Sequence, residues 1–156
     1  MRRPARWQSE FVERVSSLAD MSGLPPSFVR VFAWMVICDP PHQSVDDLKV
    51  TLGLSSGAIS MATSTLVRLG LAERIVLPGQ RRLYYRLHSN GWERMLRLRL
   101  DGATQMRVIA EEAIGSAPEG KAPDRLEQMR AVYGWFETVM ADQLDGAPWL
   151  SANPLG

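Results

Sequence analysis

Apolar residues near the start of the chain recur with a helical period. Spacings of four, four and three residues separate Trp7, Phe11, Val15 and Leu18. This pattern predicts an amphipathic helix over residues 6–21, which Gly23 would end. Pro25 suits the first turn of a second helix, and residues 25–38 are apolar nearly all round. We therefore expect the second helix to lie at the centre of the protein.

Two shorter helices are predicted next, separated by a glycine. Ser44 has an acidic residue three positions later, close to a capping box, which predicts a helix over residues 45–52. Ser55 is placed to cap a fourth helix over residues 56–69. Two short helices joined by a tight glycine-containing turn are the signature of a helix-turn-helix.

The segment after the fourth helix has the pattern of a β-hairpin. Residues 71–77 and 80–88 are rich in branched and aromatic side chains, and they flank a Pro-Gly pair, which is the preferred centre of a type II turn. We therefore expect a two-stranded wing with Arg81 and Arg82 near its tip.

Residues 90–114 and 124–144 are predicted to form two long helices. In the second of these, apolar residues recur at spacings of three, four, three and four. A seam of this kind needs a partner helix, so we predict a dimer contact through Leu126, Met129, Tyr133, Phe136 and Met140. The tail over residues 146–156 has no periodicity.

Composition excludes several classes of protein. The chain has 156 residues, of which 46% are hydrophobic and 22% are charged, the balance of an ordinary globular domain. Its longest apolar run, residues 31–38, is too short for a membrane-spanning helix, which needs roughly 20 residues. The basic start is not followed by the apolar stretch of a secretory signal. We therefore expect a cytoplasmic protein with no membrane partner.

Cysteine and histidine are too scarce for a disulfide or a metal cage. Cys38 is the only cysteine, and there are two histidines, so we expect neither a metal nor a cofactor. Asp39 follows Cys38 directly, and its charge would raise the pKa of the thiol. We expect a buried, inert cysteine, with redox sensing as the alternative.

The one match to an enzyme motif stands in the wrong context. Residues 53–57 fit G-x-S-x-G, but a nucleophile elbow must lie between a strand and a helix, and here a helix precedes it. His88 is the only histidine downstream. No phosphate-binding loop or paired His–carboxylate motif occurs. We predict that the protein is not an enzyme.

Charge is distributed unevenly along the chain. Residues 55–100 contain eight arginines and two glutamates, a net charge of +6, whereas residues 101–156 carry −5 and residues 1–54 carry zero. The middle third is therefore the part suited to a polyanion.

Four blocks of sequence resemble the MarR superfamily of winged-helix transcription regulators. The blocks are Cys38-Asp39-Pro40, LSSGAIS at 54–60, LGLAER at 69–74 and PGQRRLYYRL at 78–87. Together with the order of the helices and the wing, the resemblance covers most of residues 6–144. The DP pair, the SSGAIS opening and the PG-x-RR-x-YY wing look most like the GbsR-like branch, and are similar to mycobacterial regulators of MmpL-type lipid exporters.

The resemblance implies a mainly α fold with a two-stranded β wing. A winged helix-turn-helix DNA-binding domain would cover residues 24–89, with dimerisation helices over 6–22 and 90–145. The implied function is a homodimeric regulator, more often a repressor, that reads a near-palindromic operator and is released by a small ligand. One departure is that many wings of the family carry an acid two residues before the arginine, whereas Gly79 and Gln80 precede Arg81 here. The acid's role is therefore absent or supplied elsewhere.

The predicted DNA contacts lie on the fourth helix and on the wing. They are Ser55, Ser56, Ser60, Met61, Ser64 and Arg68 on the helix, and Arg81 and Arg82 on the wing. Short hydroxyls reach phosphates or base edges, and a methionine thioether contacts thymine methyl groups. Because the first two turns lack Arg, Asn and Gln, we expect sequence preference to depend partly on DNA shape.

An apolar or aromatic effector is a further expectation. Methionine adapts to irregular apolar ligands, and a cleft lined by Trp34, Met35, Trp92 and Met95 would hold one; a plain core is the alternative. Two rival functions stay open. One is a winged-helix module that uses the +6 surface on an acidic protein without reading DNA sequence, and the other is a small-molecule-binding protein with a vestigial wing.

Overall fold

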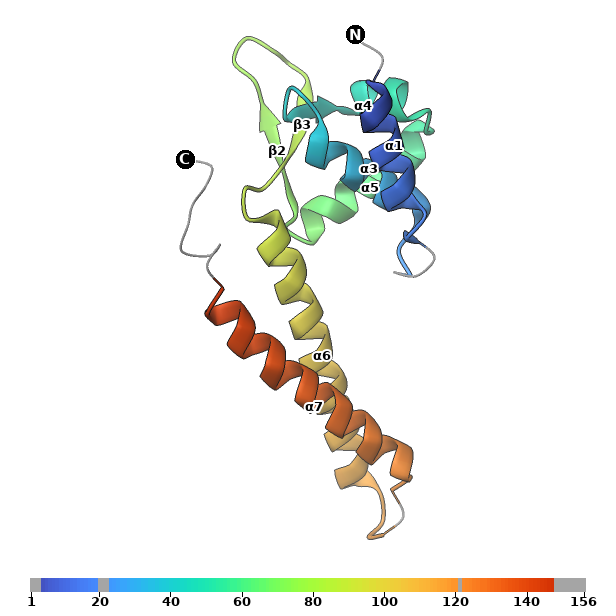
Figure 1. Ribbon diagram of the computed structural model, residues 1–156, viewed down its shortest axis with the longest axis vertical. Coiled ribbons are helices and arrows are strands. Elements are labelled where there is room, and N and C mark those ends of the chain that lie inside the picture. The colour runs from blue at the N-terminus through green and yellow to red at the C-terminus, as the bar shows by residue number, and fades with distance from the viewer. Residues whose placement is uncertain (1–3, 20–22, 121, 148–156) are drawn as a thin grey trace. The chain divides into compact units, whose positions relative to one another are not determined.

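The computed structural model describes residues 4–19, 23–120 and 122–147. The chain divides into two compact units, Met1–Gly91 and Trp92–Gly156 (Figure 1). Within the described residues, no single helix is both long and apolar enough to cross a membrane. Helices α4 (Val45–Leu52) and α5 (Ser56–Arg68) meet those criteria only as a pair, bent by 119°, and only by length and composition. The predicted tail lies outside the described residues beyond position 147.

The first unit is built around one buried helix. Its described helices are α1 (Arg6–Ser16), α3 (Pro26–Ile37), α4 (Val45–Leu52) and α5 (Ser56–Arg68). Helix α3 packs against both α1 and α5, and seven of its twelve residues are buried, which explains why its sequence is apolar nearly all round. Val31 is fully buried.

The two short helices have the caps that the sequence predicts. The Ser44 hydroxyl accepts a hydrogen bond of 3.1 Å from the Asp47 backbone N–H, and the Asp47 carboxylate accepts one of 2.9 Å from the Ser44 backbone N–H. This reciprocal pair is a capping box. Gly53 ends α4 in the left-handed region at φ 64°, and Ser55 caps α5 through the Ala58 N–H at 3.2 Å.

Helix α1 is shorter than its periodicity predicts. It ends at Ser16 rather than near residue 21, and residues 20–22 lie outside the described chain. The Ser16 and Ser17 hydroxyls donate to the carbonyls of Val12 and Arg14, local bonds that compete with continued helix. The buried face of α1 also differs from the predicted one. Val12, which is not in the predicted apolar stripe, is buried, whereas Trp7, which is in it, is 58% exposed.

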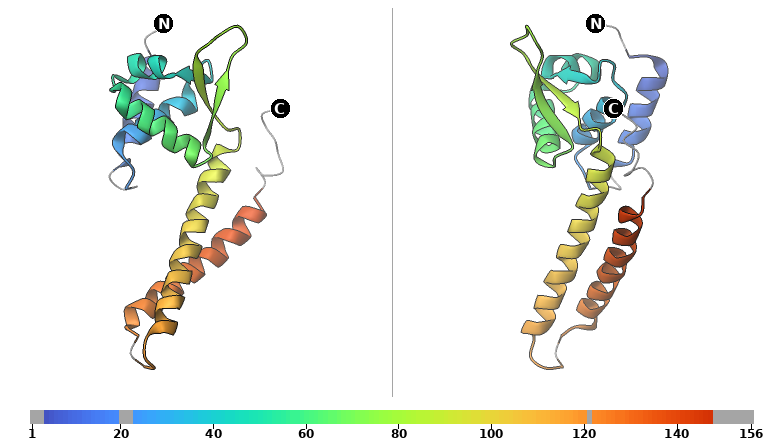
Figure 2. Two further views of the ribbon diagram at one scale, coloured as in Figure 1. Left: turned by 180° about the vertical axis from the view of Figure 1, so that it is seen from behind. Right: turned by 90° about the vertical axis from the view of Figure 1, so that its left-hand side faces the viewer.

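The described part of the chain forms an antiparallel sheet of three strands, one more than the predicted hairpin. Strands β2 (Ala72–Val76) and β3 (Leu83–Leu87) lie within the predicted ranges, and β1 (His42–Ser44) pairs with the other edge of β3 in the order β1-β3-β2. Tyr85 is the central residue of the register, opposite Gln43 on one side and Arg74 on the other. The β2–β3 hairpin projects from the helices of its unit (Figure 2).

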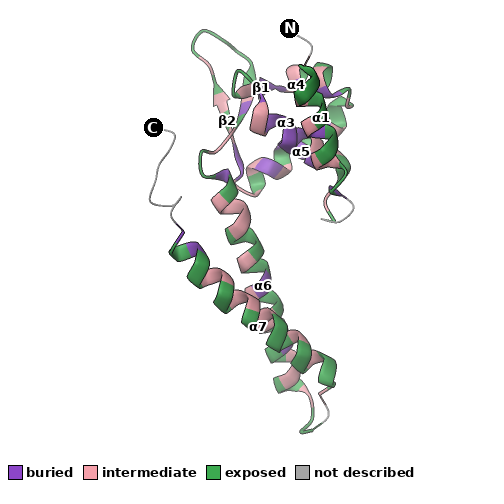
Figure 3. Cartoon of the chain, viewed as in Figure 1, coloured by how far each residue is buried: buried purple, intermediate pink, exposed green. Residues whose placement is uncertain are grey.

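The second unit is an antiparallel pair of long helices, α6 (Gly91–Ser116) and α7 (Asp124–Asp145) (Figure 2). Two ion pairs connect them: Arg107 Nε lies 2.5 Å from Glu137 Oε2, and Arg97 Nη1 lies 3.7 Å from Asp145 Oδ1. Gly134 faces the first pair, since a Cβ added there would stand 3.4 Å from Arg107 Cδ. Little of either helix is fully buried (Figure 3).

Candidate nucleic-acid interface

Helix α5 separates a buried face from an exposed one. Ile59, Ala62, Thr63 and Leu66 are buried, whereas the residues predicted to meet DNA are all exposed, namely Ser55, Ser56, Ser60, Met61, Ser64 and Arg68. Met61 is 67% exposed, although it is a large apolar side chain. The spacing along the helix therefore predicts correctly which face is free for a ligand. That this ligand is DNA stays a prediction.

The N-terminal end of α5 is suited to an anion. The first turn contains no acidic residue, and the backbone N–H groups of a helix N-terminus carry partial positive charge that favours phosphate. Gly57 stands there with no neighbouring atom within 4 Å of an added Cβ, so the surface is open. The hydroxyl of the buried Thr63 donates a hydrogen bond of 2.9 Å to the Ile59 carbonyl within the same helix, so it does not contribute to the exposed face.

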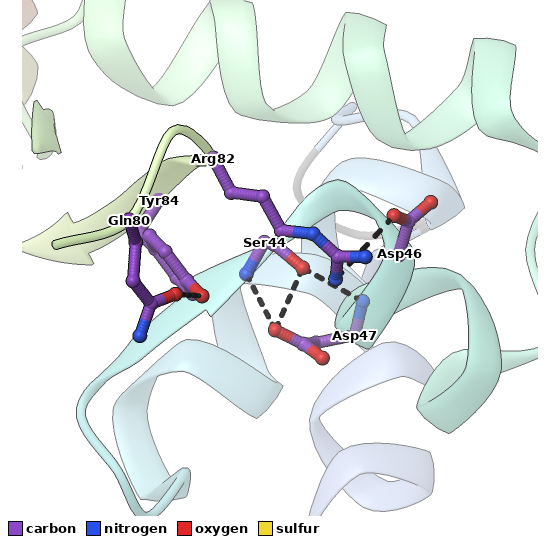
Figure 4. Close-up of polar contacts among 6 residues, drawn as sticks. All are labelled: Ser44, Asp46, Asp47, Gln80, Arg82 and Tyr84. Carbon is purple, nitrogen blue, oxygen red and sulfur yellow. Dashed lines mark hydrogen bonds and ion pairs between the residues drawn. The ribbon is translucent and has the colours of Figure 1, made fainter. Parts of the chain in front are cut away.

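The wing tip presents two exposed arginines. Arg81 and Arg82 follow Gly79, whose φ of 74° lies in the left-handed region that glycine adopts without strain. Arg82 Nη1 lies 3.9 Å from Asp46 Oδ2 of α4 (Figure 4). Both side chains are largely exposed, so the contact is weak. Asp46 thus places an acid from another element near Arg82, whereas the two wing residues just before the tip arginines, Gly79 and Gln80, are not acidic.

A hydrogen bond between side chains braces the base of the wing tip. The Tyr84 hydroxyl of β3 donates to Gln80 Oε1 (Figure 4). Gln80 stands two residues before Arg82, the spacing at which the resemblance leads one to expect an acid. The Tyr84 ring also meets the His42 ring of β1 edge-on, with centroids 5.4 Å apart. These contacts link the tip to the sheet.

The stem of the wing carries a neutralised arginine. Arg86 donates two hydrogen bonds to Glu73, which faces it across β2 and β3. The hydrogen bond from Arg86 is the main reason that the pKa of Glu73 lies below its ordinary value. Arg74, by contrast, is exposed on β2, and among the described residues it has no ion-pair partner. Arg74 is not among the DNA contacts predicted from the sequence, although its place in the alternating pattern of the strand could have indicated an exposed side chain.

The four residues predicted to line an effector cleft are divided between the two units. Trp34 and Met35 are buried in α3, and the Trp34 Nε1 donates to Gln43 Oε1 at 3.3 Å. Trp92 is 57% exposed and Met95 is half-buried, both on α6. A site that joins all four stays a prediction. The first unit alone contains a groove of about 720 Å³ to which Trp34 contributes.

Cys38 is buried at the end of α3. Its Sγ lies 3.6 Å from the Met35 carbonyl oxygen. Burial, with a smaller contribution from the Asp39 charge, raises the pKa of the Cys38 thiol to about 11. Among the described residues, no three His, Cys, Asp or Glu side chains are grouped closely enough to hold a metal ion.

Comparison with known proteins agrees with this architecture. No family model matches the chain. The chain is 33% identical over 138 residues to the HTH-type transcriptional regulator MmpR5 of Mycobacterium tuberculosis (strain ATCC 25618 / H37Rv), an alignment that covers 86% of this chain and 83% of that protein. A crystal structure described as that of a transcriptional regulator matches with a TM-score of 0.75 and 32% identity, covering 88% of this chain and 95% of the other. The mainly helical fold with its small antiparallel sheet is that of a winged-helix regulator, and the chain belongs to the HTH-type transcriptional regulators.

Proposed function

We propose that the protein is a homodimeric, sequence-specific DNA-binding repressor of the MarR superfamily, in its GbsR-like branch, that a small apolar ligand releases from DNA. One observation carries the proposal. The exposed face of α5, with no acid in its first turn, belongs to the same compact unit as a wing that ends in Arg81 and Arg82. These are the two elements with which a winged helix contacts a duplex.

The chemistry of the two elements assigns them different roles. The serine hydroxyls of α5 donate to phosphates or base edges in the major groove, and Met61 packs against thymine methyl groups. The wing arginines enter the minor groove, where the negative potential favours guanidinium. Two such units, with recognition helices about 34 Å apart, read a near-palindromic operator.

The homodimer is supported by apolar surface that one chain leaves uncovered. The large exposed apolar side chains on α6 and α7 are Trp92, Leu98, Met106, Ile109, Val132, Trp135 and Val139. The residues of the predicted seam, from Leu126 to Met140, are only half-buried. On α7, the exposed residues Val132, Trp135 and Val139 each precede a residue of the predicted seam, namely Tyr133, Phe136 and Met140. The apolar face of this helix is therefore broader than the sequence pattern indicated. A second copy of the chain would cover it.

Binding to DNA is the decisive measurement. Fluorescence anisotropy of the full-length protein is recorded on a duplex from upstream of its own coding sequence and on a scrambled duplex, across a salt series. We expect the native duplex to bind about 10³-fold more tightly. Equal, weak and uniformly salt-sensitive binding to both would contradict the proposal and favour an acidic protein as the partner of the basic face.

A further inference from the structure

The residues that line a groove in the first unit include aromatic residues from four different segments. It has a volume of about 720 Å³, within the size range of small-molecule sites. Trp7 comes from α1, Trp34 from α3, His42 from β1 and Tyr84 from β3. Trp7 is 58% exposed, which a core residue of this size would not be, so its ring is available to a ligand.

The charge of the groove is opposite to that of the wing beside it. Asp39 and Asp47 are among its lining residues, and none of the lining residues that the structure describes is a lysine or arginine. Asp47 already accepts hydrogen bonds from the Ser44 backbone N–H and hydroxyl. Asp39 is exposed, and within the described part of the chain it has no ion-pair partner. The groove therefore combines π faces with one available carboxylate.

We propose that this groove binds a small organic cation with an aromatic body. Aromatic faces attract cations through the ring quadrupole, and a carboxylate at the rim complements the same charge. An anionic ligand of equal shape would meet Asp39 and Asp47 with no compensating base among the described lining residues. The proposal rests on the proposed function and refines it, because it names the site and gives the otherwise apolar effector a positive charge.

The contacts of Tyr84 explain how a ligand bound in the groove would affect the DNA-binding surface. Its ring lines the groove and meets His42, while its hydroxyl binds Gln80, two residues before Arg82 (Figure 4). On the other side, Asp47 adjoins Asp46, the residue that Arg82 faces. A ligand that displaces the Tyr84 ring therefore loosens the wing tip, and by linkage DNA and ligand weaken each other's binding.

Two ions of the same shape and opposite charge test the ligand class. Tetraphenylphosphonium and tetraphenylborate are titrated separately into the full-length protein by calorimetry. We expect the phosphonium to bind at least about tenfold more tightly than the borate. Asp39→Asn and Trp7→Ala should each weaken phosphonium binding about fivefold or more, whereas Glu112→Gln, an exposed acid of α6, should not change it. Equal binding of the two ions, or an undiminished affinity in Asp39→Asn, overturns the proposal.

A second measurement separates this proposal from the proposed function. Without phosphonium, Asp39→Asn and Trp7→Ala should bind the native duplex as the unaltered protein does, so failure to bind DNA at all would count against the repressor and not against the groove. With phosphonium, the unaltered protein should lose duplex affinity and Asp39→Asn should lose much less. Tyr84→Phe keeps the ring and removes the bond to Gln80, so it should bind phosphonium but transmit less of the effect. A bound phosphonium that leaves duplex affinity unchanged overturns the link to the wing.

Discussion

Arg86 of β3 lies directly opposite Glu73 of β2, and its Nε donates a hydrogen bond of 3.0 Å to Glu73 Oε1. A guanidinium paired in this way contributes little to the potential that a phosphate meets. Arg81 stands at the tip without an ion-pair partner among the described residues, and the contact of Arg82 with Asp46 is 3.9 Å long and exposed. Among the described residues of the wing, the positive charge without a close ion-pair partner therefore lies at the tip, on Arg81 and Arg82, and on Arg74 of β2.

Replacing both tip arginines should weaken binding to every duplex. In Arg81→Ala/Arg82→Ala, we expect the affinities for the native and the scrambled duplex to fall together, because binding to phosphates carries no sequence information. The slope of log K against log salt should flatten by about one for each phosphate that the protein no longer neutralises. Arg86→Gln is the matched control and should change the slope much less. An unchanged slope in the double variant would exclude the wing from the interface.

The two faces of α5 should respond to truncation in opposite ways. Leu66 is fully buried and Met61 is 67% exposed. Leu66→Ala should lower the free energy of unfolding by about 2–5 kcal/mol, because it leaves a cavity in the core. Met61→Ala should change the free energy of unfolding by less than about 0.5 kcal/mol yet reduce the preference for the native duplex. Urea unfolding and anisotropy measure the two effects, and a drop in stability without a drop in preference in Met61→Ala would contradict its assigned role.

These contrasts show which features were predictable from sequence. Caps and periodicity are local, so Ser44, Ser55 and the exposed face of α5 follow from spacing alone. Strand β1 has only three residues and runs directly into α4, so it is too short to show alternation. The contact of Arg82 with Asp46 and the burial of Val12 in place of Trp7 depend on how distant segments pack, which no local pattern contains.

Cys38 should resist alkylation while the protein is folded. The thiolate is the reactive form, and a pKa of about 11 in place of 9.0 leaves about 100-fold less thiolate at pH 8. Iodoacetamide labelling followed by mass spectrometry should therefore be slow in buffer and fast in urea. Cys38→Ser gives the background. Rapid, complete labelling of the folded protein would show that the thiol is accessible and would reopen a redox role.

The contribution of the Arg107–Glu137 pair between α6 and α7 to the free energy of unfolding should depend on pH. Hydrogen bonding from Arg107 lowers the pKa of Glu137 below its ordinary value. A carboxyl whose pKa is depressed by folding stabilises the folded state above its unfolded pKa, and this contribution disappears as pH falls through the folded pKa. Urea midpoints should thus show that Glu137→Gln is less stable than the unaltered protein at pH 7, and that the gap closes toward pH 3.5. A gap that stays constant over this range would mean that the charge of Glu137 is not what stabilises the fold.

A charge on the exposed face of α7 should separate the proposed dimer. Trp135 is 67% exposed and Val132 is 61% exposed on the same helix, and a second copy of the chain would bury both. Trp135→Glu places a carboxylate in that interface, where it would lose its hydration without a compensating partner, so sedimentation should show a monomer. Gln128→Glu, at an exposed polar position of α7, adds the same charge and should leave the dimer intact. Because two linked half-sites bind far more tightly than one, Trp135→Glu should also lose most of its affinity for a near-palindromic duplex, and a dimeric Trp135→Glu would exclude this face as the interface.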